Sequence, residues 1–303
     1  MLLRSTNRRR FTGITLLSLA ALATSCSTST GDGSAIAGTA TLYFSAIPDD
    51  NKSELAEKYG LIANHLATEL GVPVEYKPSA SYEASVEAFK NGDVQLAWFG
   101  GVSGVKARSA VEGSAAIAQG KVDPQYVSYF IAHKDSGIEP GESFPDLAGK
   151  KFTFGPRGST SGRLMPTFFI QEFSGKTPEE LFGSFDFSTG HDNTAERVAS
   201  GAFDAGAMSY KTYDRMVAEG KIDPAVCVKV WTTPTYADYN WTAHPELEKR
   251  YGAGFTARLQ ETLVSITDPT LLKALQREEG MMTAKNEDFV SIHETMVALD
   301  MFR

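Results

Sequence analysis

The sequence is poor in the residues that form crosslinks and metal sites. Its 303 residues include two cysteines, Cys26 and Cys227, and five scattered histidines. If Cys26 is lipidated, as argued below, no intramolecular disulfide is possible and stability must come from the hydrophobic core. No histidine lies at ligand spacing from a cysteine, and no Glu or Asp stands out as an acid or base. We therefore expect no metal, no cofactor and no enzymatic activity.

Positive charge is also scarce. The formal net charge is -8, and residues 1–25 contribute four arginines and no acidic residue, so the remainder carries about -12. Nucleic acids and anionic membrane surfaces attract proteins through a basic face. We expect neither to be a partner of this chain.

Long apolar runs are absent too, since the longest candidate, Ile14–Ala23, is shorter than the ~20 residues that cross a bilayer. Arginines precede this run, which predicts an export signal over residues 1–25. Asn7-Arg-Arg-Arg-Phe11 resembles a twin-arginine signal, with general secretion as the alternative. Leu22-Ala-Thr-Ser-Cys26 resembles a lipobox, so we expect Cys26 to be lipidated and to anchor the protein to a membrane in the periplasm or at the cell surface. An ordinary cleaved secretory peptide is the other interpretation.

Residues 26–39 are mostly Ser, Thr, Gly and Ala and predict a flexible tether. Beyond them, strand and helix patterns alternate from Thr41 to about Tyr210, which predicts an α/β fold with largely parallel sheets. The strand-like runs are Thr41–Ile47, Val72–Tyr76, Val94–Phe99, Lys151–Phe154, Phe203–Met208 and Val226–Trp231. The helical patterns are 53–70, 82–90, 164–173, 254–266, 269–279 and 288–299. The last three suggest a helical tail that returns to an earlier domain.

The stretch Gly155-Pro-Arg-Gly-Ser-Thr-Ser-Gly-Arg-Leu-Met-Pro166 is the most informative motif. It is not a nucleophile elbow, because Thr160 stands where Gly-x-Ser-x-Gly needs serine, and it lacks the Gly-Lys of a P-loop. It follows a strand and precedes an apolar helix, so Ser159, Thr160 and Ser161 should lie at a helix N-terminus, which suits an anion. Simple capping by Ser159 is the alternative. Pro166 should lie beyond the first turn and cost that helix one hydrogen bond.

A second strand-to-helix junction is Phe187–Glu196. Asn193 with Glu196 predicts a capping box, although Asp192 could cap instead. His191 should lie just outside this helix and could donate a ring N–H to the same ligand. A structural role is the alternative for a lone histidine.

Two further junctions, Ala80–Ser85 and Ala97–Gly101, carry Tyr82, Trp98 and Phe99. Ligand crevices of open α/β sheets form at the carboxyl ends of strands, where these residues would face a ligand. The competing interpretation is that the aromatic side chains belong to the core.

Taken in order, these motifs resemble the phosphonate- and phosphite-type substrate-binding proteins of ABC importers, the PhnD family. The resemblance rests on Ser-Tyr-x-x-x-Val-Glu-Ala, Ala-Trp-Phe-Gly, Gly-Ser-Thr-Ser-Gly-x-Leu-x-Pro, Gly-His-Asp and Asp-Tyr-Asn-Trp-Thr, and covers Tyr43 to about Leu299. Within the family, Phe44–Asp49 and Tyr236–Trp241 are most similar to a subgroup described as selenate-binding.

The resemblance implies a two-lobed periplasmic binding protein of type II, in which each lobe is a mostly parallel sheet flanked by helices and two crossings form a hinge. The lobes would span residues 40–130 with 235–303, and 131–234. The implied ligand contacts are Ser159, Thr160, Ser161 and His191 on the second lobe, Tyr82, Trp98 and Phe99 on the first, and Tyr126 and Asp238 near the crossings. The implied partners are a small oxyanion and a membrane permease, and we expect a monomer.

Asp238 bears on the identity of that oxyanion. An ionised carboxylate only accepts hydrogen bonds, so beside an anion it favours an oxygen that carries a proton. Phosphite, phosphonate, hydrogen phosphate and selenite satisfy this condition, whereas selenate and sulfate do not; capping of a local turn is the alternative role. A secreted hydrolase using Ser159 or Ser161, and a sensory module presenting its ligand to a receptor, remain as rival functions.

Overall fold

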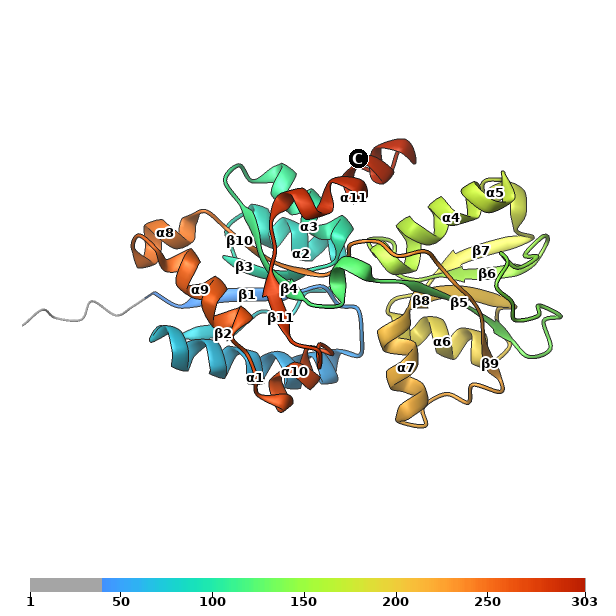
Figure 1. The fold of residues 1–303 in the computed structure, drawn as a ribbon, viewed down its shortest axis with the longest axis horizontal. Helices are drawn as coiled ribbons and strands as arrows, with labels where there is room; N and C mark the ends of the chain where they lie inside the picture. The colour runs from blue at the N-terminus through green and yellow to red at the C-terminus, as the bar shows by residue number, and fades with distance from the viewer. Residues whose placement is uncertain (1–39, 303) are drawn as a thin grey trace, which may run out of the picture. The chain divides into compact units, whose positions relative to one another are not determined.

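A computed structural model describes residues 40–302. The expected export signal, the tether and Cys26 lie outside these residues. No helix in the described part is long and apolar enough to cross a membrane. Two sheets organise this part of the chain (Figure 1). Each sheet with its covering helices is called a lobe below.

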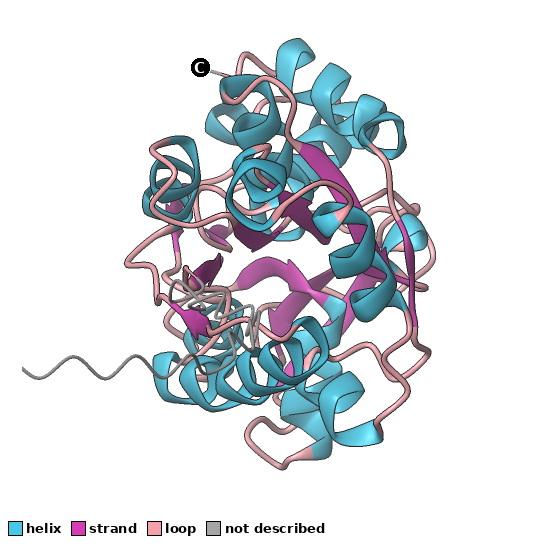
Figure 2. Ribbon diagram, turned by 90° about the vertical axis from the view of Figure 1, so that its left-hand side faces the viewer, coloured by secondary structure: helices cyan, strands magenta, loops and turns pink. Residues whose placement is uncertain are grey.

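The first lobe contains a six-stranded sheet in the order β11-β4-β10-β3-β1-β2. Its strands are β1 (Leu42–Ala46), β2 (Val74–Tyr76), β3 (Leu96–Phe99), β4 (Ala115–Gly120), β10 (Asn240–Ala243) and β11 (Met281–Thr283). Its helices are α1 (Lys52–Leu70), α2 (Tyr82–Lys90), α3 (Gly101–Ala110), α8 (Glu246–Tyr251), α9 (Phe255–Val264), α10 (Pro269–Ala274) and α11 (Val290–Ala298), with 3₁₀ turns η1 (Asp123–Gln125) and η3 (Asn286–Phe289). Figure 2 shows helices on both sides of the strands.

The second lobe contains a five-stranded sheet in the order β7-β6-β8-β5-β9. Its strands are β5 (Ser128–His133), β6 (Lys151–Phe154), β7 (Ser184–Phe187), β8 (Ala205–Ser209) and β9 (Cys227–Thr232). Its helices are α4 (Met165–Ser174), α5 (Pro178–Leu181), α6 (His191–Ala199) and α7 (Tyr210–Ala218), and the π-helical turn η2 (Thr160–Leu164) leads into α4.

Local sequence signals account for the best-predicted elements. In α1 the apolar positions of the predicted pattern are buried, the Asn51 side chain accepts from the Ser53 N–H, and Gly71 ends the helix with a φ of 67°. The predicted tail helices appear as α9, α10 and α11; α9 and α10 contact α1, and α11 contacts α3. The return of the tail to the first lobe is thereby confirmed, but β10 and β11 were not predicted.

Most strands of each sheet point the same way, as expected, but both sheets are mixed, because β10 and β11 in the first and β5 in the second run opposite to the others. In the first sheet β2, β1 and β3 are parallel, but β10 is antiparallel to β3 and β4, and β11 is antiparallel to β4. In the second sheet β6 is parallel to β7 and β8, while β5 is antiparallel to β8 and β9. The chain reaches β5 and β10 by crossing from the other sheet. Successive strands of one sheet are usually parallel because a helix connects them on one face. Strands β5 and β10 are reached from the other sheet, so this connection does not set their direction.

The two crossings run side by side. Tyr126, between β4 and β5, and Tyr236, between β9 and β10, form an antiparallel bridge with backbone N–H to carbonyl distances of 2.9 and 3.0 Å. The expected lobe limit after residue 130 falls inside β5, and the limit after residue 234 falls between β9 and β10. This pairing places both connections at one narrow junction between the lobes.

Candidate ligand-binding site

The Ser-Thr-Ser stretch lies at a tight turn after β6. The Gly155 N–H donates to the Gly162 carbonyl at 2.8 Å, and a Cβ on Gly155 would lie 2.7 Å from the Gly162 Cα, so neither position has room for a side chain. The Ser159 hydroxyl oxygen accepts from the Gly162 N–H at 2.9 Å, which makes Ser159 the cap of η2. Capping and site membership are therefore compatible roles for this residue.

Pro166 lies beyond the first turn of its helical segment, as predicted. The π-helical turn over residues 160–164 runs directly into α4, and the Met165 N–H donates to the Thr160 carbonyl. Proline has no N–H with which to continue these hydrogen bonds. The Ser161 and Gly162 carbonyls accept instead from the Ser128 hydroxyl and the Gly155 N–H, so the expected loss of one helical hydrogen bond is observed.

His191 is the first residue of α6, not a residue outside it, and Gly190 is the N-cap. The predicted Asn193 capping box is wrong because the N-cap lies three residues earlier, at Gly190. The ring Nδ1 accepts from the Ser209 N–H at 3.2 Å, so the proton of the neutral ring resides on Nε2, which lies 3.2 Å from the Ser159 oxygen. Burial lowers the pKa of His191 to about 4. The ring is therefore a neutral hydrogen-bond donor at physiological pH.

Thr160 connects the two lobes at the start of α3. Its hydroxyl oxygen accepts from the Val102 N–H at 3.1 Å. In the same place the Asp238 Oδ1 accepts from the Gly101 N–H at 2.9 Å, and the Thr160 hydroxyl also interacts with this carboxyl group. Since Gly100 offers α3 no capping side chain, Asp238 caps a helix remote in sequence and not the local turn of the alternative interpretation.

Asp238 is only 1% exposed. Burial raises the pKa of its carboxyl group to about 7, against the opposing effect of hydrogen bonds from Gly101 and Thr160. Its Oδ2 has no hydrogen-bond partner among residues 40–302. One oxygen of this carboxyl group is thus fixed by α3, and the other is available to a ligand.

Tyr82 and Ser161 also carry buried polar atoms without a hydrogen-bond partner in residues 40–302. Tyr82 is the first residue of α2, and burial raises the pKa of its hydroxyl well above the usual value, which keeps it protonated. Neither the Tyr82 hydroxyl nor the Ser161 Oγ makes a hydrogen bond of normal geometry within the described residues. Buried polar groups normally have partners, so these atoms make the junction of the lobes a candidate site for a polar ligand.

Of the aromatic residues expected at the site, some face the junction of the lobes and one belongs to the core of the first lobe. Trp98 stacks on Tyr239 with ring centroids 5.6 Å apart, and the Tyr126 hydroxyl bonds to the Ser209 Oγ. Phe99, the neighbour of Trp98 on β3, packs against Phe89 within the first lobe. Side chains alternate across a strand, so Trp98 and Phe99 face opposite sides of the sheet and Phe99 contributes to the core.

Asp49 is a buried carboxylate that sequence reasoning missed. It is 9% exposed, and its Oδ1 has no hydrogen-bond partner in the described chain. Its charge raises the pKa of Tyr82, and its carbonyl accepts from the His191 N–H at 3.0 Å. The sequence could have pointed to Asp49 through its position just after β1, because ligands bind at the carboxyl ends of parallel strands in open α/β sheets.

Arg277 lines the same small cavity as Trp98 and Tyr126. Its guanidinium forms a buried ion pair with Asp123, with Nη2 and Oδ1 2.7 Å apart, and lies 5.3 Å from the Trp98 ring centroid and 4.8 Å from that of Tyr239. Cation–π contacts of this kind hold the rings in place. No sequence signal singled out Arg277.

The site therefore gathers the N-termini of α2, α3, η2 and α6, at which backbone N–H groups and the helix dipole favour negative charge. No group of three His, Cys, Asp or Glu side chains in residues 40–302 is arranged to hold a metal ion. Two mixed sheets, two paired crossings and a polar site between the lobes define the class of bilobal substrate-binding proteins.

Comparison with known proteins assigns the family. The sequence model described as "ABC transporter, phosphonate, periplasmic substrate-binding protein" matches residues 44–289, and the chain belongs to this family. It is accordingly a substrate-binding component of an ABC importer, as the sequence predicted. Proteins of this kind are transport components and not enzymes, and they work with a membrane permease. Nothing in the comparisons points to a selenate-binding subgroup.

Relatives and solved structures agree with this assignment. The chain is 36% identical over 228 residues to the probable ABC transporter phosphite binding protein PhnD1 of Prochlorococcus marinus, covering 74% of this chain and 77% of the relative. It is 33% identical to the phosphate-import protein PhnD of Mycolicibacterium smegmatis, covering 68% and 67%. The structure of Prochlorococcus PhnD1 in complex with methylphosphonate has a TM-score of 0.80 at 33% identity, covering 86% of this chain and 98% of that one.

Proposed function

We propose that this protein binds a small protonated oxyanion of the phosphite and phosphonate class between its lobes and delivers it to the permease. The observation that carries the proposal is that the buried polar atoms without a hydrogen-bond partner in residues 40–302 include those of Ser161, Tyr82 and Asp238, which lie together in the candidate site. The serine and tyrosine hydroxyls can donate to an oxyanion, and Asp238 can share a proton with it.

The remaining contacts complete a donor set. Ser159, Thr160 and the neutral His191 would donate from the second lobe, with Trp98 and Tyr126 as walls. A ligand held from both lobes favours closure, and we infer that the paired segments at Tyr126 and Tyr236 act as the hinge. The relatives named for phosphite, phosphate and methylphosphonate support this ligand class.

Asp238 also sets the order of preference among oxyanions. Phosphite, methylphosphonate, hydrogen phosphate and selenite can each supply or accept the shared proton. Selenate and sulfate have no proton at neutral pH, so an ionised Asp238 repels them. We therefore expect selenite, but not selenate, among the secondary ligands.

A hydrolase using Ser159 is disfavoured by the geometry of His191. The contact between Ser159 and the ring resembles a nucleophile with its base, but the ring nitrogen facing Ser159 carries the proton and cannot accept another. Nδ1 accepts from a backbone N–H, whereas in a catalytic triad the corresponding nitrogen donates to a carboxylate. With its pKa lowered to about 4, the ring is also a weak base.

Calorimetric titration tests the proposal. Phosphite, methylphosphonate, phosphate, selenite, selenate and sulfate are titrated separately into the ligand-free protein. We expect the protonated oxyanions to bind and sulfate and selenate to bind weakly or not at all. The proposal is refuted if none of the six binds with a Kd below about 100 μM.

We further propose that Cys26 is lipidated and anchors the protein outside the cytoplasm. The lipobox-like sequence Leu22–Cys26 and the periplasmic family support this. Mass spectrometry of the mature N-terminus checks it directly, and Cys26→Ser should release the protein from the membrane fraction. A mature protein that begins elsewhere without lipid would contradict the anchor but not the oxyanion site.

A further inference from the structure

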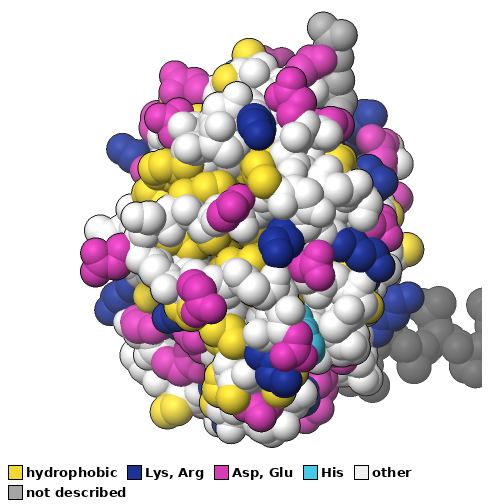
Figure 3. Space-filling view, turned by 90° about the vertical axis from the view of Figure 1, so that its right-hand side faces the viewer, with side chains coloured by type: hydrophobic (Ala, Val, Ile, Leu, Met, Phe, Trp, Pro, Cys, Tyr) yellow, Lys and Arg dark blue, Asp and Glu magenta, His cyan; other side chains and the backbone are white. Residues whose placement is uncertain are grey.

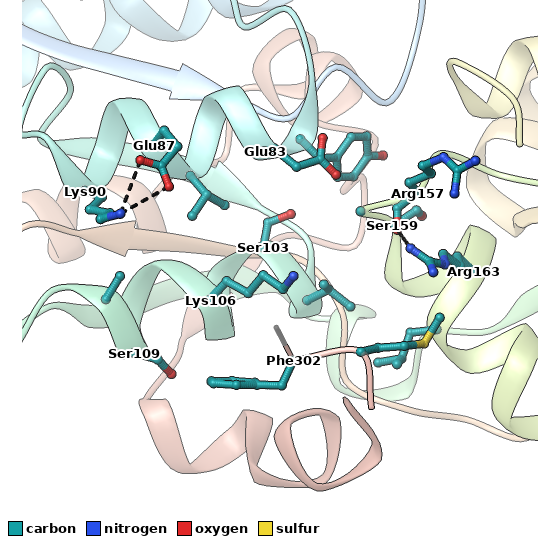
Figure 4. Close-up of a pocket in the computed structure, with 17 residues that line it drawn as sticks. Glu83, Glu87, Lys90, Ser103, Lys106, Ser109, Arg157, Ser159, Arg163 and Phe302 are labelled. Atoms are coloured by element: carbon teal, nitrogen blue, oxygen red, sulfur yellow. Dashed lines mark hydrogen bonds and ion pairs between the residues drawn. The ribbon is translucent and has the colours of Figure 1, made fainter. Parts of the chain in front are cut away.

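Two pockets of opposite net charge lie between the lobes. On one side a pocket of ≈ 470 Å³ lies between α2 and α3 of the first lobe and residues 157–164 of the second. Four basic and two acidic side chains line it, namely Lys90, Lys106, Arg157 and Arg163 against Glu83 and Glu87. Figure 4 shows Arg157 and Arg163 on one side of the pocket, with Glu83 and Lys106 on the other.

The other pocket is acidic. A pocket of ≈ 820 Å³ between α1, α7 and the α10 region is lined by seven acidic and four basic side chains. An anion approaching a protein of formal net charge -8 is repelled there, whereas the first pocket attracts it. Figure 3 shows acidic and basic side chains interspersed over the face of the second lobe, whereas basic side chains outnumber acidic ones in the first pocket.

The two arginines are held close together on the second lobe. Arg157 and Arg163 lie over the same Phe187 ring, at 3.9 and 5.1 Å from its centroid, and the Arg163 Nη1 donates to the Arg157 carbonyl at 2.9 Å. No ion pair within 4.0 Å links either guanidinium to a carboxylate of the described residues. Glu83 faces Arg163 at longer range, and Asp186 near Arg157 pairs with Arg197. The two guanidinium groups therefore give this side of the pocket a positive electrostatic potential.

This basic pocket adjoins the inner site. Ser159 and Tyr82 line the pocket and are also candidate ligand contacts. Arg157 and Arg163 flank Ser159, Thr160 and Ser161 within a single turn of chain. Both arginines therefore stay beside Ser159, Thr160 and Ser161 whether the lobes are open or closed.

Resting on the proposed function, we propose that this pocket is an outer anion subsite and the entrance to the inner site. Arg157 and Arg163, with Lys106 opposite, hold an incoming phosphonate or phosphite anion before it passes to Ser159, Thr160 and Ser161. The expected consequence is kinetic. Long-range attraction raises the association rate constant and leaves the dissociation rate constant of the inner complex nearly unchanged.

Stopped-flow fluorescence with methylphosphonate tests this inference. Arg157→Gln with Arg163→Gln should lower the association rate constant about tenfold at 20 mM NaCl, and the difference should vanish near 0.5 M NaCl, where charges are screened. The dissociation rate constant should change less than about twofold. Lys134→Gln with Lys176→Gln removes the same charge from exposed positions elsewhere on the second lobe and should leave both constants unchanged.

A charge-preserving variant separates electrostatics from damage to the turn. Arg157→Lys with Arg163→Lys should restore the wild-type association rate constant. The inference is overturned if the glutamine variant associates as fast as wild type, if the control variant slows equally, or if the lysine variant stays slow. A wild-type protein that binds none of the oxyanions would instead refute the proposed function.

Discussion

The Thr160 hydroxyl oxygen accepts a hydrogen bond of 3.1 Å from the Val102 N–H, across the boundary between the lobes and 58 residues away in sequence. The adjacent Ser161 hydroxyl has no partner in residues 40–302. The two neighbouring side chains should therefore respond differently to removal. Under the proposed function, Thr160 would serve both lobe closure and the ligand, whereas the Ser161 hydroxyl would serve the ligand alone.

Alanine substitutions check this difference. Thr160→Ala and Ser161→Ala should each weaken methylphosphonate binding by about 1 to 3 kcal/mol, because a charged ligand loses a buried donor. Ser161→Ala should leave the free energy of unfolding of the ligand-free protein within about 0.5 kcal/mol of wild type, as measured with urea. Unchanged affinity in both variants would reduce the motif to a helix cap.

Gly158 allows the lobes to approach each other. A Cβ at this position would lie 2.5 Å from the Tyr82 Cβ on the other lobe. Gly158→Ala should therefore hinder closure and weaken ligand binding by about tenfold or more, since the closed state makes the full set of contacts. Small-angle scattering should show that ligand no longer compacts the variant.

Gly60→Ala provides the matched control, because a Cβ at Gly60 in α1 meets nothing within 4 Å. This variant should bind and close as wild type does. A Gly158→Ala protein with normal affinity would show that the contact with Tyr82 is not required in the bound state.

Asp238 predicts a pH dependence with a definite sign. Its pKa is raised from the ordinary 3.8 to about 7, so between these values the folded protein holds a proton that the unfolded chain has lost. Its contribution to stability therefore becomes less favourable as pH rises from about 4 to about 7. The shared proton also becomes scarcer, so methylphosphonate affinity should fall between pH 7 and pH 9.

Asp238→Asn checks both effects by calorimetry and urea unfolding. Asparagine keeps an acceptor for the Gly101 N–H but does not titrate. The variant should show a flatter pH profile for affinity and for stability, and it should gain affinity for sulfate. An unchanged profile would assign the pH dependence to the ligand alone.

Arg215 joins the lobes on the acidic side of the cleft. It pairs with the buried Asp50 and, at 3.1 Å, with Glu54, both at the start of α1. Burial raises the pKa of Asp50 to about 6, even with Arg215 beside it. Arg215→Gln should leave Asp50 without its partner in the closed state, weaken ligand affinity about tenfold and speed dissociation.

Arg250→Gln is the control for Arg215, because Arg250 pairs with Glu246 within α8. It should change affinity less than twofold, as exposed helical pairs contribute little. If Arg215→Gln also binds normally in calorimetry, these ion pairs do not favour the closed state.

The sequence by itself determined the features that depend on neighbouring residues. It located α1 and α2 within a residue, the strand before Gly155, and the placement of Ser159, Thr160 and Ser161 at a helix N-terminus. Periodic burial and helix capping act over a few residues, so they can be read from the chain directly. The ordered motifs also identified the family, which the matched model and relatives confirm.

Only the tertiary structure decided what depends on residues distant in sequence. Asp238 caps α3 from 137 residues away, Asp49 joins the site from the end of β1, and β5 and β10 take directions that their own residues do not specify. The raised pKa of Asp238 and the lowered pKa of His191 come from burial by both lobes. Desolvation and inter-lobe hydrogen bonds arise only when the chain has crossed twice and closed, because no local pattern encodes them.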